Sequence, residues 1–390
     1  MPGYELINKK DELAEIKKIF NNGSVFFRYG FKNIRNNKYL VSEFEKKFSK
    51  KLRSKYALAV SSGTAALRVA LAVLNLKADD EVITQSFTFV ATVEAIIESG
   101  AIPKCVEIDD TLNMDPNDLI KKISKKTKAI ILVHMLGSPG RIDKILKICK
   151  KNNIIVIEDT AWGLGATYKK RYLGTIGRMG TFSFDYAKMI TTGEGGMLLF
   201  KSKKDFLKAK AWHDHGHDNN PKFPRWEDTR SNSGFNFRMS ELQAAVGLAQ
   251  LRKLDQVLKF HKINSSKIFN KIKNISEVKI RHIPLKSSPS NDAFIFILPT
   301  KKLAKICKMN LNKNKISTKI LPEAKTWHFC KYWAHMYELK KANKKKLYYS
   351  FPKSENILSR CISISINCKM NKSLPNMIYS IVNKVLLSEK

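Results

Sequence analysis

Apolar and polar positions follow one another along this chain in blocks that predict strands, several of them followed by a helix. Short apolar runs, such as residues 57–60 (ALAV) and 154–157 (IIVI), have the length and composition of buried strands. Segments with helical spacing of apolar residues follow several of these runs, the first directly after residues 61–64 (SSGT). Strands that alternate with helices predict a mostly parallel sheet covered by helices on both faces. The expected fold class is therefore α/β.

The pattern changes at about residue 256, after the start of one long helical segment. Later segments with strand-like or helical patterns lie at 278–283, 292–300, 301–310 and 361–367. This mixture predicts a smaller α+β domain. We expect residues 1–255 to form an N-terminal arm and a large domain, and residues 256–390 to form a small C-terminal domain, with the long helix joining the two.

The composition is that of an ordinary globular protein, with 390 residues of which 43% are hydrophobic. No apolar run is long enough to span a bilayer, and residues 1–20 are too charged for a signal peptide, so no membrane partner is expected. The six cysteines form no CxxC pair and are not densely spaced. We therefore expect reduced thiols and a cytoplasmic location.

The formal net charge of +37 is the unusual property of the composition. Such an excess can indicate binding to nucleic acid or to a membrane surface. Here Lys and Arg are scattered through every segment and are not gathered into one basic arm. We therefore expect no nucleic-acid partner, although the positive charge would favour an anionic substrate.

The stretch 154–200 carries the candidate chemistry. Its first strand ends in two carboxylates, Glu158 and Asp159, and a second short strand (TFSF) leads to Lys188. The Gly-rich turn 191–196 (TTGEGG) then reverses the chain into a third apolar run. A lysine near an acid suits pyridoxal 5'-phosphate (PLP), which needs a Schiff-base lysine and an acidic partner for its ring nitrogen. We therefore expect PLP as the cofactor.

A phosphate site is expected where the first helix after the ALAV strand begins. Gly63 and Thr64 lie in the first turn of that helix, where free backbone N–H groups and the helix dipole favour an anion. Ser and Thr are also ordinary N-cap residues, so this unit alone is a weak indication. With Lys188 downstream, it becomes a candidate for binding the cofactor phosphate.

Three segments in this order resemble the DegT/StrS-type sugar aminotransferase family. They are EDTAWGLGA (158–166), GTFSFDYAK (180–188) and TTGEGG (191–196). The resemblance implies the type I PLP aminotransferase fold (aspartate aminotransferase-like), with a large PLP-binding domain and a smaller C-terminal domain. It also implies a PLP-dependent transaminase that uses glutamate as the amino donor and a sugar as the acceptor.

The resemblance also implies roles for individual residues. Lys188 would form the Schiff base and move the proton, Asp159 would keep the ring nitrogen protonated, and Ser183 would bind the phosphate. The aromatic residue that stacks on the pyridine ring is Phe89, in a TFVAT segment. The plain alternatives are a solvated Lys188, among 71 Lys and Arg residues, and a core Phe89 beside a strand end.

One position departs from the family pattern. Members usually carry Gln or His three residues after the aspartate, against the phenolic oxygen of the cofactor, whereas this chain has Trp162. An indole N–H can donate a hydrogen bond but cannot accept one, and the ring is bulkier. The dehydratase branch of the family replaces the lysine by histidine. Lys188 is retained here, which favours amino transfer over dehydration.

The segment GFNFRM (234–239) resembles the part of the family that reaches into the active site of a second subunit. The resemblance implies a homodimer with shared sites, in which Asn236 contacts the cofactor phosphate from the other chain and Arg238 is a further basic candidate. Just before it, HDHGHD (213–218) could suggest a metal site. Nothing in the sequence supplies a second half-site, so we expect no metal and assign His215 to a loop that binds the substrate or the partner subunit.

Segments outside the cofactor motifs resemble one branch of the family, which aminates C8 of 8-oxo-3,8-dideoxy-manno-octulosonate with glutamate for cell-surface polysaccharides. They are MPGYEL, FRYG, EIDDTLNMDP, HMLGSPGRIDKI, DHGHD, WHFCKYWAHMYELK and FPKSENILSRCISISI. Two alternatives stay open: a nucleotide-linked keto-deoxysugar as the substrate, and a PLP-binding protein that has lost catalysis. Arg28, Lys32 and Arg35 are candidate cations for a sugar carboxylate. His134, at a strand end, is expected to line the floor of the site.

Overall fold

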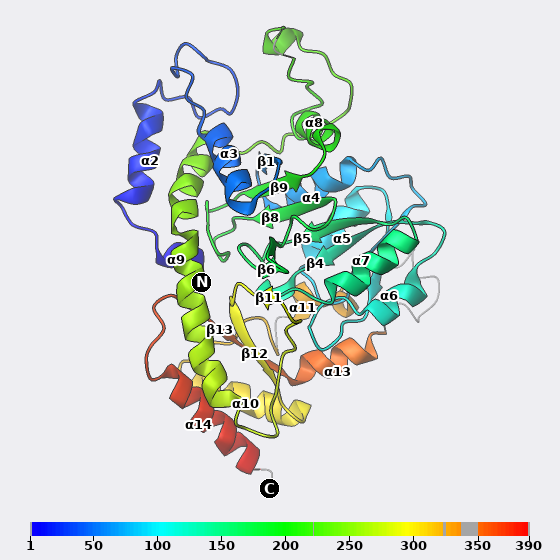
Figure 1. Ribbon diagram of the computed structural model, residues 1–390, viewed down its shortest axis with the longest axis vertical. Helices are drawn as coiled ribbons and strands as arrows, with labels where there is room; N and C mark the ends of the chain where they lie inside the picture. Colours follow the sequence, from blue (N-terminus) through cyan, green and yellow to red (C-terminus); the bar gives the residue numbers. More distant parts are fainter. Residues whose placement is uncertain (1, 221, 323–324, 337–349, 389–390) are drawn as a thin grey trace.

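The computed structural model describes residues 2–220, 222–322, 325–336 and 350–388 (Figure 1). A seven-stranded sheet forms the centre of its larger part. In chain order its strands are β1 (Tyr56–Val60), β2 (Glu81–Gln85), β3 (Ile102–Val106), β4 (Thr127–Val133), β5 (Ile155–Asp159), β8 (Met179–Ser183) and β9 (Gly196–Phe200). Across the sheet their order is β1-β9-β8-β5-β4-β2-β3.

Only β9 runs against its neighbours in this sheet, because it pairs antiparallel with both β8 and β1. The pairs β5–β8, β4–β5, β2–β4 and β2–β3 are parallel. The expected mostly parallel sheet is therefore confirmed. The carboxyl ends of β5 and β8 lie side by side, with Asp159 paired to Thr181, so the residues after them share one edge of the sheet.

Helices cover both faces of this sheet, because its strands bury side chains on both sides. The helices around it are α3 (Leu40–Leu52), α4 (Gly63–Ala72), α5 (Val90–Glu98), α6 (Pro116–Lys122), α7 (Ile142–Lys151), α8 (Lys203–Trp212) and α9 (Glu241–Ile272). Leu58 and Leu198 pack with α4, α5 and α8 on one face. Their neighbours Ala59 and Met197 pack with α3 and α9 on the other. Farther along this second face, β2, β4 and β5 pack against α6 and α7.

The long helix α9 connects the large sheet to the C-terminal part of the chain (Figure 1). Its start is fixed by a capping box, in which Ser240 and Gln243 each bond to the backbone N–H of the other. Its 32 residues confirm the single long helical pattern. The boundary expected at residues 255 and 256 falls inside this helix, so the division of the chain into two domains at that point stays a prediction.

A second, three-stranded sheet with helices follows α9. Its strands are β10 (Lys279–Ile280), β12 (Ala293–Ile297) and β13 (Cys361–Ser365), and its helices are α10 (Lys301–Lys313), α13 (Pro352–Arg360) and α14 (Leu374–Leu387). The end of α9, through Ile268 and Ile272, belongs to the apolar core of this unit. A short sheet of β6 (Thr167–Tyr168), β7 (Arg171–Tyr172) and β11 (Ser287–Ser288) lies against the large one.

The N-terminal segment packs along the first half of α9 (Figure 1). It contains α1 (Pro2–Glu5) and α2 (Asp11–Phe20). Glu12 of α2 accepts hydrogen bonds of 2.7 Å from both Gln250 and Lys253 of α9. Among the described residues, we find no helix whose length and hydropathy would suit a membrane crossing.

Candidate active site

A cavity of about 460 Å³ opens at the carboxyl ends of β5 and β8. The segments that meet there include the start of α4, the turn after β2, the residues after β5, and the loop from β8 to β9. The sequence-predicted residues that line it are Gly63, Thr64, Phe89, Asp159, Trp162, Ser183 and Lys188. The structure thus brings seven of the eight cofactor residues into one cavity within one chain, and only Asn236 is missing.

Lys188 lies in a turn directly after β8. Its backbone N–H donates to the carbonyl of Asp185 at 3.1 Å, and its Nζ lies 3.6 Å from the centroid of the Trp162 ring. Removal from water lowers the pKa of Lys188 to about 8; Asp185 opposes this change, while the charge of Lys319 adds to it. At pH 7 roughly a tenth of this amine is therefore neutral, compared with less than about one part in a thousand for a lysine at the ordinary value of 10.5, and the neutral form is the nucleophile.

Asp159 ends β5 inside the same cavity. Its carboxylate accepts hydrogen bonds from Thr92 Oγ1 at 3.0 Å and from the backbone N–H of Ala161 at 3.1 Å. Burial raises the pKa of Asp159, and these two bonds only partly oppose that rise. A cation placed against this carboxylate would favour its ionised form, so the residue suits a protonated ring nitrogen.

The neighbouring carboxylate, Glu158, has a different task. It accepts hydrogen bonds from His134 Nε2 at 2.9 Å and from the backbone N–H groups of Gly174, Ile176 and Gly177 at 2.6 to 2.8 Å. Burial alone would raise the pKa of Glu158, but these donors hold it below its ordinary value. Glu158 therefore anchors the loop before β8 and does not line the cavity.

The start of α4 provides a site for a phosphate group. Ser62 caps the helix by accepting a 3.0 Å hydrogen bond from the N–H of Ala65, and Gly63, Thr64 and Ser183 line the cavity beside it. A Cβ atom on Gly63 would lie 2.8 Å from the Cβ of Ser183, so the close approach of these two segments requires glycine. The first turn of this ten-residue helix and the hydroxyl groups of Thr64 and Ser183 therefore lie together at the cavity, where they would favour an anion.

Trp162 also fits a bound cofactor. Its indole lines the cavity, yet its buried Nε1 has no hydrogen-bond partner among the described residues. Because this nitrogen is buried, the indole presents its ring and not its N–H to the cavity, and the Nζ of Lys188 lies over that ring. The phosphate position, Asp159 and Lys188 together make the cavity suitable for PLP.

The rim of the cavity includes residues that sequence reasoning missed. Trp327 and His328, in the short helix α11 (Lys325–His328), lie with ring centroids 6.0 and 5.4 Å from that of Phe89. The N–H of Thr88 donates to the carbonyl of His328 at 3.0 Å, which ties the two segments together. The aromatic composition of the segment WHFCKYW, which contains both residues, was the only feature that could have indicated them, and its spacing did not predict a binding site. The final residues 337–340 of the longer branch-like segment lie outside the described residues.

Arg28 and Arg35 do not line this cavity. Arg28 is only 4% exposed and donates to Glu45 at 2.6 Å and to the carbonyl of Ala59 at 2.7 Å. Arg35 is also buried and donates to backbone carbonyls of its own segment, including that of Phe27 at 2.7 Å. Both guanidinium groups are thus engaged in holding the N-terminal segment. A role for Arg28 toward a sugar carboxylate stays a prediction. The contacts of its guanidinium group with Glu45 and Ala59 do not support that role.

The three remaining candidates lie away from the cavity of their own chain. His134 is buried against Glu158, below the lining. His215 and Asn236 are exposed on the excursion between α8 and α9, which extends from the top of the molecule in Figure 1. Buried Asp214, which binds Arg225 at 2.5 Å and Arg238 at 2.6 Å, orders this excursion. The described residues contain no group of three or more His, Cys, Asp or Glu suited to a metal.

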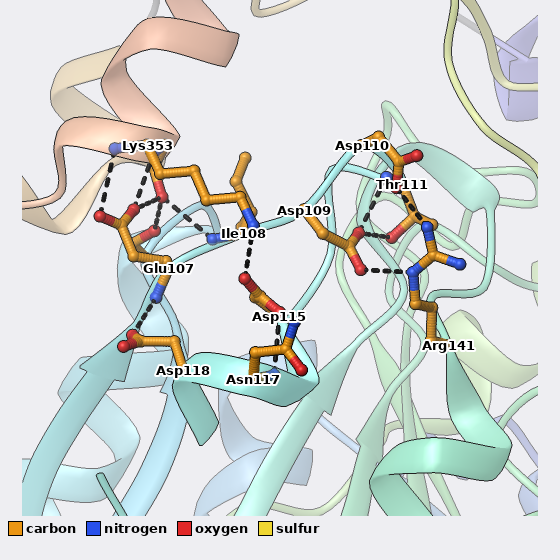
Figure 2. Close-up of polar contacts among 12 residues, drawn as sticks. Glu107, Ile108, Asp109, Asp110, Thr111, Asp115, Asn117, Asp118, Arg141 and Lys353 are labelled. Carbon is orange, nitrogen blue, oxygen red and sulfur yellow. Dashed lines mark hydrogen bonds and ion pairs between the residues drawn. The ribbon is translucent and has the colours of Figure 1, made fainter. Parts of the chain in front are cut away.

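The acidic turn after β3 binds the start of α13 in the C-terminal unit (Figure 2). The carboxylate of Glu107 accepts hydrogen bonds from the backbone N–H groups of Lys353 and Ser354, at 3.2 and 2.8 Å, in the first turn of α13. The ammonium group of Lys353 in turn donates to Asp115 at 2.5 Å. On the other side of the turn, Arg141 binds Asp109 at 2.9 Å. The contacts with Lys353 and Ser354 therefore attach the C-terminal unit to this turn, whereas Arg141, which directly precedes α7, holds the turn within the larger unit.

Comparison with solved structures identifies the fold. The aminotransferase PseC of Helicobacter pylori, which acts in pseudoaminic acid biosynthesis, superposes with a TM-score of 0.84 at 25% identity and covers 98% of each chain. A GDP-4-keto-6-deoxymannose-3-dehydratase, solved with a trapped PLP–glutamate geminal diamine, gives a TM-score of 0.82 at 25% identity, covering 97% of this chain and 98% of the other. The expected type I PLP aminotransferase fold is confirmed.

Sequence comparison identifies the family. The GDP-perosamine synthase of Escherichia coli O157:H7 is 41% identical over 219 residues, which is 56% of this chain and 59% of that protein. A model of the DegT/DnrJ/EryC1/StrS aminotransferase family matches residues 30–383. PLP, expected from Lys188 and Asp159, is confirmed as the cofactor. The chain belongs to the DegT/DnrJ/EryC1/StrS family of PLP-dependent sugar aminotransferases.

Proposed function

We propose that this protein transfers the amino group of glutamate to a carbonyl carbon of a sugar. The observation that carries this proposal is the presence of Lys188 and Asp159 in one cavity, next to the anion position at Gly63, Thr64 and Ser183. Retention of the lysine supports amino transfer over dehydration. Retention of all these groups together also argues against a PLP-binding protein without catalysis.

PLP, when bound, supplies a carbonyl for amine exchange and a ring that withdraws electrons from the reacting carbon. The residues of this chain would perform the remaining tasks. Thr64 and Ser183 would bind its phosphate and so orient the group, and Phe89 would pack against the ring. Asp159 would favour a protonated ring nitrogen, because an adjacent carboxylate favours the charged form.

Lys188 would act as the base and acid of the reaction. Its pKa of about 8 would leave some neutral amine to remove the proton from Cα of glutamate and deliver it to the carbonyl carbon of the cofactor. In the second half-reaction the same amine would move a proton from that carbon to the sugar carbon. The indole of Trp162 lies directly beneath this amine and limits its movement.

For the sugar, we propose 8-oxo-3,8-dideoxy-manno-octulosonate, used in cell-surface polysaccharide biosynthesis. The branch-like segments support this substrate, and one of them supplies Trp327, which lines the cavity and is 62% exposed. Tyr186, also in the lining, is 56% exposed, so both rings are available to a sugar. The second candidate is a nucleotide-linked keto-deoxysugar, which the similarity to a GDP-perosamine synthase favours.

We further propose that the active form is a homodimer in the cytoplasm, with Asn236 and Arg238 completing the site of the partner. Large apolar side chains are exposed on the N-terminal segment and on the excursion before α9, including Phe31 and Phe235 at about half of their surface. Trp226, in the same excursion, is 85% exposed. Such a patch supports burial against a second copy.

The test is a visible spectrum of the purified protein, recorded before and after glutamate and then after each candidate sugar. We expect glutamate to convert the absorbance to that of the aminated cofactor, and the octulosonate to restore it. Restoration by a nucleotide-linked sugar alone would select the second candidate. No response to glutamate in a protein that binds PLP would refute amino transfer from this donor.

A further inference from the structure

We propose that a second cavity, at the opposite end of the large sheet from Lys188, binds a small phosphate-bearing anion. This cavity has a volume of about 440 Å³ and lies between the end of α3, the β6–β7 hairpin and the outer ends of β8 and β9. Its lining contains six basic residues and no acidic residue. The basic residues are Arg53, Lys55, Lys170, Arg171, Arg178 and Lys201.

The second cavity is separate from the cofactor site. β8 begins directly after Arg178 and ends at Ser183, which lines the first cavity. β9 returns from Gly196 to Phe200, beside Lys201. The two cavities therefore lie at opposite ends of the same strands, roughly 15 Å apart for five residues of strand. The six cations cannot contact a ligand at Lys188.

Most of this positive charge has no acidic partner. Arg178 forms two 2.8 Å hydrogen bonds with Asp205. For the other five basic residues, the described residues provide no carboxylate within ion-pair distance. Two of the five donate hydrogen bonds to backbone carbonyls instead: Arg171 to Thr175 at 3.0 Å and Lys201 to Ile176 at 2.6 Å. Partial removal from water and the charge of Arg171 lower the pKa of Lys201. A concave surface lined by one sign of charge focuses its potential and attracts counter-ions.

The backbone holds two of these cations in an uncommon conformation. Arg53 ends α3 with φ of +56°, and Lys170 lies in the β6–β7 turn with φ of +63°. Glycine or asparagine is usual at such positions, because a longer side chain there costs about 1 kcal/mol. Lys169, the other residue of that turn, also has a positive φ, of +48°. These conformations fix the course of the backbone at Arg53 and Lys170, where both residues line the cavity.

Phosphate is the group that this arrangement suits. Arg53 and Arg171 can each donate two parallel N–H groups to phosphate oxygens, while lysines add charge from several directions. The volume is within the range of small-molecule sites and accommodates pyrophosphate or a nucleoside diphosphate. Tyr172 also lines the cavity.

Chemical protection tests the location of this site. The full-length, PLP-loaded protein is treated with a lysine-acylating reagent, with and without inorganic pyrophosphate, and each lysine is followed by mass spectrometry. We expect pyrophosphate to protect Lys55, Lys170 and Lys201 about fivefold or more, because bound phosphate shields their amines. Lys301 and Lys305, exposed on α10, should be unaffected. Equal protection of both groups of lysines would overturn the proposal.

Calorimetric titration with pyrophosphate tests the contribution of the charges. Replacing Arg53 and Lys170 together by Gln should weaken binding about tenfold or more, whereas replacing Lys301 and Lys305 by Gln, with the same loss of charge, should change it less than about twofold. Equal weakening by both pairs would refute a defined site and indicate attraction to the net charge alone. ADP distinguishes the source: affinity equal to that of pyrophosphate supports a ligand recognised by phosphate alone, and tighter binding supports a nucleotide.

Discussion

The Nζ of Lys188 lies 3.6 Å from the centroid of the Trp162 ring. A second ammonium group, that of Lys319, lies 4.6 Å from the centroid of the same ring. The π face stabilises a cation, whereas removal from water and the nearby charge of Lys319 favour the neutral amine of Lys188. Burial is the largest cause of the lowering, and the pKa of Lys188 falls to about 8. Trp162 therefore positions an amine that remains reactive.

Lys188→Ala should abolish covalent attachment of PLP, because no other amine lines the cavity among the described residues. Borohydride reduction followed by mass spectrometry measures the attachment. Lys319→Ala is the matched control, since it removes the other ammonium group beside Trp162 and should retain the label on Lys188. A label that persists in Lys188→Ala would assign the Schiff base to another lysine.

The pH dependence of PLP uptake should report the lowered pKa of Lys188. The neutral amine attacks the cofactor, so the uptake rate of the cofactor-free protein should rise with pH and level off above about 8. For a lysine with the ordinary pKa of 10.5, the uptake rate would instead keep rising until the pH reached about 10.5.

Two variants should move this midpoint in opposite directions. Lys319→Met removes a positive charge near Lys188 and should raise the midpoint. Asp292→Asn removes a negative charge, which favours the ammonium form, and should lower it. Each shift should be roughly half a unit to one unit, as expected for a nearby charge. Shifts of the same sign would show that packing and not charge controls the amine.

Asp159→Asn and Glu158→Gln should separate chemistry from stability. Asp159→Asn should retain PLP but lower turnover roughly 100-fold or more, because the ring nitrogen loses its anionic partner. Glu158→Gln should instead cost about 2–4 kcal/mol in the free energy of unfolding, because buried donors lose their acceptor. Turnover is measured with glutamate, and stability by urea denaturation. Near-normal turnover of Asp159→Asn would contradict this role and would show that another group stabilises the protonated ring nitrogen.

The stability difference at Glu158 should disappear in acid. The pKa of this carboxyl is held below its ordinary value of 4.5, so its contribution is present above that pH and is lost as the pH falls through the folded value. The wild type and Glu158→Gln should therefore converge in stability as the pH falls below 4.5 and through the lowered pKa of Glu158.

The parts of this molecule that sequence could predict are those set by local pattern. The residues after β5 and β8 were predictable as a PLP site, because a strand end, a lysine and a Gly-rich turn are local features. Trp327 was not, since it reaches the cavity through backbone contacts with a turn more than two hundred residues earlier. The ion pair of Arg28 with Glu45 could not be predicted either, because the position of Glu45 depends on how α3 packs.

Arg28→Ala should therefore mainly destabilise the fold. It leaves the carboxylate of Glu45 without its buried partner, which typically costs about 3–5 kcal/mol. Urea denaturation measures this loss, and Lys32→Ala, an exposed cation of the same segment, should change stability little. A normal unfolding midpoint with a raised KM for the sugar would instead place Arg28 at the substrate.

Mixing two inactive variants should test the shared site. In a hybrid of Lys188→Ala and Asn236→Ala chains, one site regains both wild-type residues if Asn236 reaches across the dimer, while the other site lacks both. Random exchange should therefore restore about a quarter of the wild-type activity, since half of the dimers are hybrids with one intact site. Activity is assayed after the chains exchange, with each variant alone as the control. If Asn236→Ala alone is impaired and the exchanged mixture recovers nothing, Asn236 acts in its own chain, and the exposed aromatic excursion has another role.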